Sequence, residues 1–275
     1  MKKQVLLETL EKYGITPTKA RGQNFLIDEN LLNAMVADMD LQAGEKVLEV
    51  GPGAGVLTSR MINAGCDVFA VELDNKLHEY LTDTHKEENF TLIHKDACKV
   101  DFETYLGLPG DFRCLANLPY AISSIFVAKM LDLCTPPLEM YFLVQKEMAD
   151  RVCAPANNKD YGHLTVRAQA LYNCKIVRKV PPSVFHPQPK VDSAFLKLAK
   201  KEQVPSREVF KLLSQISKVA FSQRRKKALK MLGQVFNKDL LKEAYQAVDI
   251  SVDIRAENIT VEQYIALAEY MLDKI

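Results

Sequence analysis

Five apolar runs, each of strand length, alternate with segments whose apolar residues recur at helical spacing. The runs cover residues 46–51, 67–72, 90–96, 112–119 and 140–146, and helical patterns lie between them at 55–65, 74–87 and 123–133. Strands that are apolar throughout are buried on both faces, and strands that alternate with helices form parallel sheets. The sequence therefore predicts an α/β fold with a doubly wound, mostly parallel sheet. Two later runs, 174–180 and 192–200, are expected to pair as an antiparallel edge.

The pattern changes near residue 205. From there on, amphipathic helices are predicted at 209–221, 225–236, 239–248 and 261–272. Nine of the eleven glycines lie in residues 1–110, where tight turns between strands and helices need them. We predict two domains, residues 1–202 with the sheet and a smaller all-α domain at 203–275. The second is mildly basic, with 13 Lys and Arg against 10 Asp and Glu after residue 200, which is compatible with contact to nucleic acid.

The bulk composition excludes several classes. The longest apolar stretches are far shorter than the roughly 20 residues that span a bilayer, and Glu8 and Glu11 interrupt any apolar signal region. We expect a cytoplasmic protein with no membrane association. The six cysteines are scattered without a CxxC pair, so neither a zinc site nor a disulfide framework is predicted, and no metal is expected.

In an open α/β sheet, ligands bind at the carboxyl ends of the strands. The first strand ends in a turn with glycines at 51, 53 and 55. Gly51 and Gly53 let the backbone approach a ligand, although a purely structural turn is the alternative. The spacing lacks the last glycine of the dinucleotide motif, because Val56 occupies that position, so we favour a cofactor without a pyrophosphate.

The second and third strands end in carboxylates. Glu72 lies 21 positions beyond Gly51, about where an acidic residue accepts hydrogen bonds from ribose hydroxyls. The alternative role, a helix N-cap, suits Asp74 better. Asp96 can accept a bond from an adenine amino group or can cap a turn, and the residues alone leave both open.

The fourth strand ends in Asn117, Leu118, Pro119 and Tyr120. An aryl amine is a poor nucleophile because its lone pair is delocalised into the ring. The Asn117 side-chain oxygen and the Leu118 carbonyl can accept both N–H bonds of such an amine and localise the pair. Pro119 stiffens the turn, and Tyr120 offers a face on which a base can stack. The set predicts methyl transfer to an amino group of a base, with an ordinary turn as the alternative.

These strand ends belong to a longer series of motifs. In order, the motifs are 22–26 (GQNFL), 48–55 (LEVGPGAG), 71–72 (VE), Asp96, 117–123 (NLPYAIS), 145–147 (QKE), 180–191 (VPPSVFHPQPKV), 221–226 (FSQRRK) and 255–258 (RAEN). The series resembles the ribosomal RNA adenine dimethyltransferases, and within them the bacterial small-subunit enzymes.

The resemblance implies a Rossmann-like methyltransferase sheet and S-adenosylmethionine as methyl donor. It places the donor at Asn24, Leu26, Gly51, Glu72, Asp96 and Asn117, to which the glycine turn adds Gly53. It also implies a catalytic set of Asn117, Leu118, Pro119 and Tyr120, with Phe185 closing on the other face of the target adenine. The expected substrate is two adjacent adenosines near the 3′ end of 16S ribosomal RNA in an immature small subunit. We expect a monomer that needs no metal.

Arg224, Arg225, Lys226 and Lys227 form a basic cluster, which we interpret as an RNA contact, with a solvated helix face as the alternative. Three rival functions remain. One is a 23S large-subunit dimethyltransferase of the antibiotic-resistance type. The second is a ribosome-assembly factor whose methylation is incidental. The third is a nicotinamide oxidoreductase, which would bind NADH.

Overall fold

The computed structural model describes residues 3–17, 23–103 and 111–274, and the chain divides into two compact units. The first unit comprises Met1–Ala149 and Lys175–Ala199, and the second comprises Asp150–Cys174 and Lys200–Ile275. This division differs from the expected single boundary after residue 202, because Asp150–Cys174 groups with the C-terminal helices. The helical unit is therefore assembled from two separate stretches of chain.

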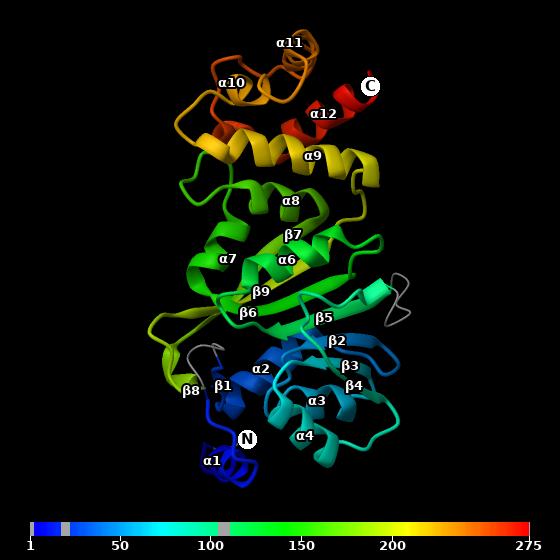
Figure 1. Cartoon of the computed structure of the whole chain (residues 1–275), viewed down its shortest axis with the longest axis vertical. Coiled ribbons are helices and arrows are strands. Elements are labelled where there is room, and N and C mark those ends of the chain that lie inside the picture. Colours follow the sequence, from blue (N-terminus) through cyan, green and yellow to red (C-terminus); the bar gives the residue numbers. More distant parts are fainter. Residues whose placement is uncertain (1–2, 18–22, 104–110, 275) are drawn as a thin grey trace. The chain divides into compact units, whose positions relative to one another are not determined.

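A seven-stranded sheet runs through the first unit in the order β4-β3-β2-β5-β6-β9-β7 (Figure 1). Its strands are β2 (Lys46–Val50), β3 (Asp67–Glu72), β4 (Phe90–His94), β5 (Phe112–Asn117), β6 (Glu139–Gln145), β7 (Tyr172–Val180) and β9 (Ser193–Lys200). The first five pair in parallel, and β9 pairs antiparallel with β6. The mostly parallel sheet and the late edge strands predicted from the apolar runs are confirmed.

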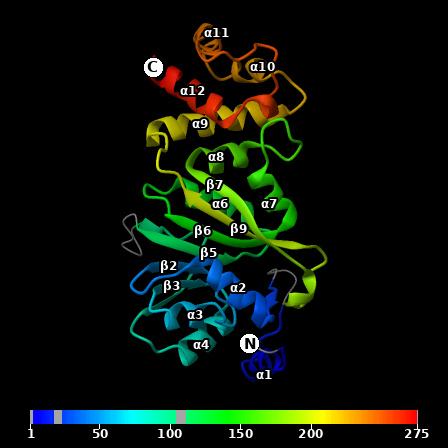
Figure 2. The same ribbon diagram turned by 180° about the vertical axis from the view of Figure 1, so that it is seen from behind.

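Helices cover both faces of this sheet, as its two-sided apolar strands require. On one face, alternate residues such as Leu115 and Tyr141 pack in one core with Met35 of α2 (Glu29–Met39) and Met61 of α3 (Thr58–Asn63). On the other face, Phe142 meets Phe126 of α6 (Ser123–Asp132) with ring centroids 6.0 Å apart. In Figure 1 α6 lies toward the viewer, and α2 comes to the front in the reverse view of Figure 2. The fold is therefore doubly wound.

A short two-stranded sheet lies beside the main one. β1 (Phe25–Leu26) pairs antiparallel with β8 (Phe185–His186), so that Leu26 lies opposite Phe185. The N-terminal helix α1 (Lys3–Lys12) packs Leu6 and Leu10 in a small core with Leu77 of α4 (Asn75–Thr84). α1 therefore packs beside α4 within the first unit.

The second unit is helical. Its helices are α8 (His163–Leu171), α9 (Arg207–Ala220), α10 (Ala228–Leu232), α11 (Lys238–Ala247) and α12 (Val261–Leu272), and α7 (Lys146–Cys153) spans the division between the units. Short 3-10 turns lie at Phe221–Gln223 and Ala256–Asn258 in this unit, and at Pro182–Val184 in the first unit. The tail helices were predicted, although α10 is only five residues long.

Specific contacts explain why residues 150–174 belong to the helical unit. The Tyr161 hydroxyl donates to the Ile259 carbonyl at 3.0 Å. Arg167, almost fully buried, lies over the Phe210 ring and donates to the Ser214 hydroxyl at 3.2 Å. A buried guanidinium needs such partners. Its α9 partners lie beyond residue 205 in sequence, so a reading of local patterns cannot link them.

Candidate active site

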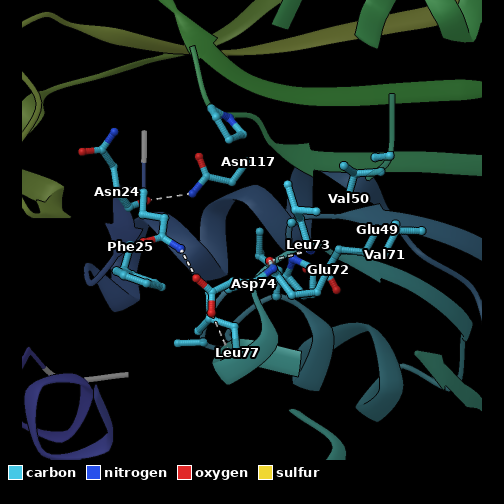
Figure 3. A pocket seen from close by; sticks show the side chains of 18 of the residues that line it. Asn24, Phe25, Glu49, Val50, Val71, Glu72, Leu73, Asp74, Leu77 and Asn117 are labelled. Atoms are coloured by element: carbon cyan, nitrogen blue, oxygen red, sulfur yellow. Dashed lines mark hydrogen bonds between the residues drawn. The ribbon is translucent and has the colours of Figure 1, made fainter. Parts of the chain in front are cut away.

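Four strand ends meet at one cavity of about 310 Å³, which we call the strand-end cavity (Figure 3). Its lining includes the glycine turn after β2, Glu72 at the end of β3, Asp96 after β4 and Asn117 at the end of β5. Asn24 and Leu26 line it from the β1 segment. The structure thus brings together seven predicted donor-binding residues: Asn24, Leu26, Gly51, Gly53, Glu72, Asp96 and Asn117. The motif that includes Gln23 and Asn24 begins at Gly22, which lies outside the described residues.

The glycine turn has a backbone that other residues rarely adopt. Gly51 has φ of +67° and Gly53 has φ of +59°. A Cβ on Gly53 would also lie only 3.3 Å from the Phe25 ring, so a side chain there would be both strained and crowded. The turn is left open toward the cavity, as the predicted close approach of a ligand requires.

Glu72 holds this turn in place. One carboxylate oxygen accepts from the Gly53 N–H at 3.3 Å, and the other accepts from the N–H groups of Leu73 and Asp74, each at 2.9 Å. The side chain is 6% exposed. A carboxylate bonded to several N–H groups has a fixed orientation before any ligand arrives.

Asp74, not Glu72, is the N-cap of α4. Its Oδ1 accepts from the N–H groups of Lys76 and Leu77 at 3.0 and 3.3 Å, as expected of a residue at that position. Its other oxygen accepts from the Gln23 amide at 3.3 Å (Figure 3). Gln23 and Asp74 both line the strand-end cavity, and the sequence reasoning assigned neither of them to the site.

Asp96 caps the turn that follows β4. Its Oδ1 accepts from the Cys98 N–H at 2.9 Å, and its Oδ2 lies 3.7 Å from the Lys99 ammonium. The carboxylate nevertheless lines the cavity. The two roles left open by the sequence are therefore compatible, because the capping bond uses one oxygen only.

Glu49 was also missed. This glutamate is the last but one residue of the apolar strand β2, is 3% exposed and accepts from the Thr58 hydroxyl at 2.6 Å. Burial raises the pKa of Glu49 to about 8, because a charged carboxylate is costly to remove from water. A single acidic residue inside an apolar strand was the signal that could have found it.

Asn117 is fixed through its amide nitrogen. Nδ2 donates to the Asn24 carbonyl at 3.0 Å (Figure 3). This bond tethers the segment before β1 to the end of β5 and orients the Asn117 side chain in the cavity lining. Asn24 therefore contributes its backbone, which no side-chain motif predicts.

The predicted catalytic residues that follow Asn117 differ in whether they line the strand-end cavity. Pro119 lines it. Leu118 is 2% exposed and donates its N–H to the Leu143 carbonyl at 3.2 Å. The Tyr120 hydroxyl lies 2.7 Å from the hydroxyl of Ser193, a fully buried residue at the start of β9. Neither Leu118 nor Tyr120 is part of the lining, although both adjoin residues that are.

Phe185 lies in the core of the first unit and not in the lining of the strand-end cavity. Its ring is 4% exposed and packs in the main core with Leu26 and Val180, and it does not line the cavity. The pairing of β1 with β8 explains this position, because it sets Phe185 opposite Leu26 and buries both. Phe185 is thus a core residue in this structure, and its contact with a target adenine stays a prediction.

The basic cluster of the second unit falls into two pairs. Arg224 donates to the carbonyls of Lys159 and Tyr161, and Lys227 binds the Asp253 carboxylate at 2.6 Å. Arg225 and Lys226 are exposed and have no ion pair among the described residues. Two of the four predicted RNA ligands are thus engaged within the unit, and two project freely.

Neither a membrane span nor a metal-binding group is found in the part of the chain that the structure describes. There, no helix is both long and apolar enough to cross a bilayer. No three His, Cys, Asp or Glu side chains of the described ranges are grouped as metal ligands would be.

Solved structures resemble the fold. A dimethyladenosine transferase from Plasmodium falciparum is 23% identical and superposes with a TM-score of 0.74, covering 88% of this chain and 95% of that one. The 23S rRNA methyltransferase ErmE, also 23% identical, has a TM-score of 0.66 over 90% of this chain and 99% of its own. At this identity the likeness establishes the methyltransferase fold.

Curated relatives match over nearly their whole length. The ribosomal RNA small subunit methyltransferase A of Clostridium acetobutylicum is 37% identical over 266 residues, which are 95% of this chain and 96% of the relative. The protein of the same name from Clostridium botulinum is 35% identical over 271 residues, 97% of this chain and 98% of the relative. A family model for ribosomal RNA adenine dimethylase matches residues 17–273. The chain therefore belongs to the ribosomal RNA adenine dimethylase family.

Proposed function

We propose that this protein transfers methyl groups from S-adenosylmethionine to the exocyclic amino groups of two adjacent adenosines near the 3′ end of 16S ribosomal RNA. The observation that carries the proposal is the meeting of Gly51, Glu72, Asp96 and Asn117 at one cavity. Relatives that match it over most of their length are named small-subunit methyltransferases. We infer a late, immature small subunit as the substrate particle, and a monomer as the acting species in the cytoplasm.

The strand-end cavity fits this donor. Among the described residues, the carboxyl groups of Glu72, Asp74 and Asp96 line it against one cation, that of Lys95, and Glu49 adds a fourth carboxyl that burial keeps neutral. An acidic lining favours a ligand that carries positive charge, as a sulfonium and an ammonium do. Glu72 is positioned for ribose hydroxyls and Asp96 for an adenine amino group, while the glycine turn admits close approach. When bound, S-adenosylmethionine supplies an electrophilic methyl group.

The chain's own residues prepare the amine. The bond from Asn117 Nδ2 to the Asn24 carbonyl leaves the Asn117 Oδ1 to accept an N–H of the target amine. Pro119 has no N–H and keeps the turn rigid. Tyr120 offers its ring for stacking, worth about 1–3 kcal/mol for an unstacked base, and its hydroxyl is held by Ser193. Because the ring of Phe185 is buried in the core, our proposal gives the stacking role to Tyr120 alone.

A strong general base is unnecessary, since the proton can leave to solvent after transfer. Positioning therefore dominates the catalytic contribution of the protein. A second transfer to the same nitrogen further requires space for the methylated amine to rotate and present its remaining N–H.

The decisive test combines the protein, labelled S-adenosylmethionine and two particles, immature small subunits and large subunits. We expect dimethyladenosine in small-subunit RNA only, identified by mass spectrometry of the digested nucleosides. Label in large-subunit RNA alone would instead support the antibiotic-resistance type of enzyme. An absence of dimethyladenosine in both would overturn the proposal.

We propose that the helical unit docks on ribosomal RNA through its free cations, Arg225 and Lys226. Docking is separable from catalysis, so Asn117→Ala should strongly reduce the methylation rate and leave particle binding intact. Loss of both in Asn117→Ala would contradict this division. Arg225→Glu with Lys226→Glu should flatten the salt dependence of RNA binding. An unaltered slope would identify the two residues as solvated surface charge.

A further inference from the structure

A second cavity, of about 540 Å³, lies within the helical unit. α10, α11 and the loop at residues 252–253 surround it, and we call it the lysine cavity. Its lining residues are Lys227, Leu229, Lys230, Gly233, Gln234, Lys238, Leu241, Lys242, Val252 and Asp253. No sequence motif marks this cavity.

The lining is strongly cationic. Four lysines face one carboxylate, and that carboxylate, on Asp253, is already paired with Lys227. The side chains of Lys230 and Lys238 are exposed and make no ion pair or hydrogen bond with another described residue. Lys242 lies 3.6 Å from Asp239, but both side chains are mostly exposed, so water screens that pair. At least two full positive charges are therefore free at the cavity.

The positions of two lysines are unfavourable for the helices that carry them. Lys227 is the N-cap of α10, and Lys238 is the first residue of α11. A helix N-terminus disfavours a cation there by about 0.3–1 kcal/mol. Lys227 is compensated by Asp253, and α11 carries Asp239 in the same first turn as Lys238, with its carboxylate 3.6 Å from the Lys242 ammonium. The acidic residues at these two helix starts thus offset part of the cost, and an arriving anion would offset more of it.

The walls of the cavity are well fixed. Leu241 is fully buried, and the N–H of Ala228 donates to the Ile254 carbonyl at 2.9 Å. Gly233 gives room to one lysine, since a Cβ on it would lie 3.4 Å from Cγ of Lys238. The lysine stems therefore extend from a rigid frame, while their ammonium groups remain accessible.

We propose that the lysine cavity binds the phosphate backbone of ribosomal RNA, as a docking site additional to Arg225 and Lys226. The proposal rests on the proposed function, which supplies RNA as the partner. Lysine ammonium groups act as point charges toward phosphate. Cations from two helices, together with an apolar floor of Leu229, Leu241 and Val252, suit a folded polyanion that fills a concave surface.

The test reverses the two free charges with Lys230→Glu and Lys238→Glu together. Glutamate in the first turn is favourable for α11, so folding should be preserved, and circular dichroism with thermal melting checks it. The matched control is Lys211→Glu with Lys218→Glu, two exposed lysines of α9 in the same unit but outside the cavity. The probe is a transcript of the 3′ domain of small-subunit ribosomal RNA, titrated at several salt concentrations.

We expect the cavity variant to bind the transcript more weakly and to lower the slope of log K against log salt by about 2, one per lost phosphate contact. The control should keep the original slope. Equal slopes in the two variants would overturn the proposal. Loss of polyglutamate binding with unchanged RNA binding would also overturn it, by assigning the cavity to an acidic protein.

Two further readouts separate this inference from the proposed function. The affinity for S-adenosylmethionine and the formation of dimethyladenosine at saturating RNA should be unchanged in the cavity variant. If the wild-type protein makes dimethyladenosine while the cavity variant keeps its salt slope, only the cavity inference fails. If the wild-type protein makes none, the proposed function fails first.

Discussion

In the strand-end cavity the polar side chains are already bonded to the protein, whereas in the lysine cavity they extend into water. Glu72 accepts three backbone N–H groups and Asn117 donates to a carbonyl, while Lys230 and Lys238 have no such partner within the described chain. The first arrangement fixes a small molecule to a fraction of an ångström. The second attracts a large polyanion without demanding one geometry. Substitutions should therefore act through geometry in one cavity and through charge in the other.

The largest effect is expected at the floor of the strand-end cavity. Burial raises the pKa of Glu49 to about 8, whereas an unfolded chain releases this proton near pH 4.3. Stability from the neutral carboxyl is thus complete below about pH 4.3 and is lost as the pH rises toward 8. Glu49→Gln mimics the neutral form and cannot ionise. At pH 8 its free energy of unfolding should therefore exceed that of the wild type by several kcal/mol.

Thermal unfolding between pH 5 and pH 8 checks the prediction for Glu49. The wild-type melting temperature should fall relative to that of Glu49→Gln as the pH rises, and the two should converge near pH 5. If the plots of melting temperature against pH were parallel for the two proteins, Glu49 would be ionised even when buried. The strand-end cavity would then resemble the solvated lysine cavity more closely.

Next in size is Asn117→Ala, which removes both the acceptor for the target amine and the bond to the Asn24 carbonyl. We expect the methylation rate at saturating RNA and donor to fall about 10²–10³-fold, as when one preorganised polar group is lost elsewhere. Asn117→Asp keeps an oxygen but cannot donate to Asn24, so it separates the two roles. If the loss of methylation rate in Asn117→Ala became smaller at low salt, the loss would be due to charge and not to the geometry of the site.

Glu72→Gln should have a smaller effect, limited to the donor. The amide keeps the shape of the side chain but loses its charge and one acceptor oxygen. Calorimetric titration with S-adenosylmethionine should show binding about 10- to 100-fold weaker, the usual loss for a charge-assisted hydrogen bond. Glu88→Gln, at an exposed position of the same unit, is the control and should bind normally. The RNA salt slope should not change in either variant.

The smallest effect concerns the Tyr120–Ser193 hydrogen bond at 2.7 Å. Ser193→Ala should lower kcat about fivefold, corresponding to one neutral hydrogen bond of about 1 kcal/mol, and leave donor affinity unchanged. Tyr120→Phe removes the same bond from the other side. The double variant should therefore be no worse than either single variant. Additive losses would mean that the serine does not position the tyrosine.

The sequence predicted the sheet and the strand-end residues because both depend on local patterns. Apolar runs locate the strands, and parallel strands necessarily end at one edge, so Gly51, Glu72, Asp96 and Asn117 could be brought together without coordinates. Contacts between distant segments carry no such pattern. The burial of Phe185 depends on β1 pairing with β8, and the engagement of Arg224 depends on carbonyls more than sixty residues earlier in the chain. The lysine cavity has no local pattern for the same reason, because it depends on how its helices and loop come together. Glu49 differs, since a lone acidic residue in an apolar strand is a local signal, although its raised pKa depends on its burial.

The helical unit is built from Asp150–Cys174 and the tail that begins at Lys200, and this has a consequence for synthesis. Residues 150–174 leave the ribosome before α9 and α12 exist, so Arg167 and Tyr161 have to wait for Phe210 and Ile259. A chain that ended after β9 would leave the side chains of Arg167 and Tyr161 without these partners. We expect such an intermediate to be a substrate for chaperones, and a stop codon after β9 would remove most of the helical unit while leaving Asp150–Cys174 without its partners.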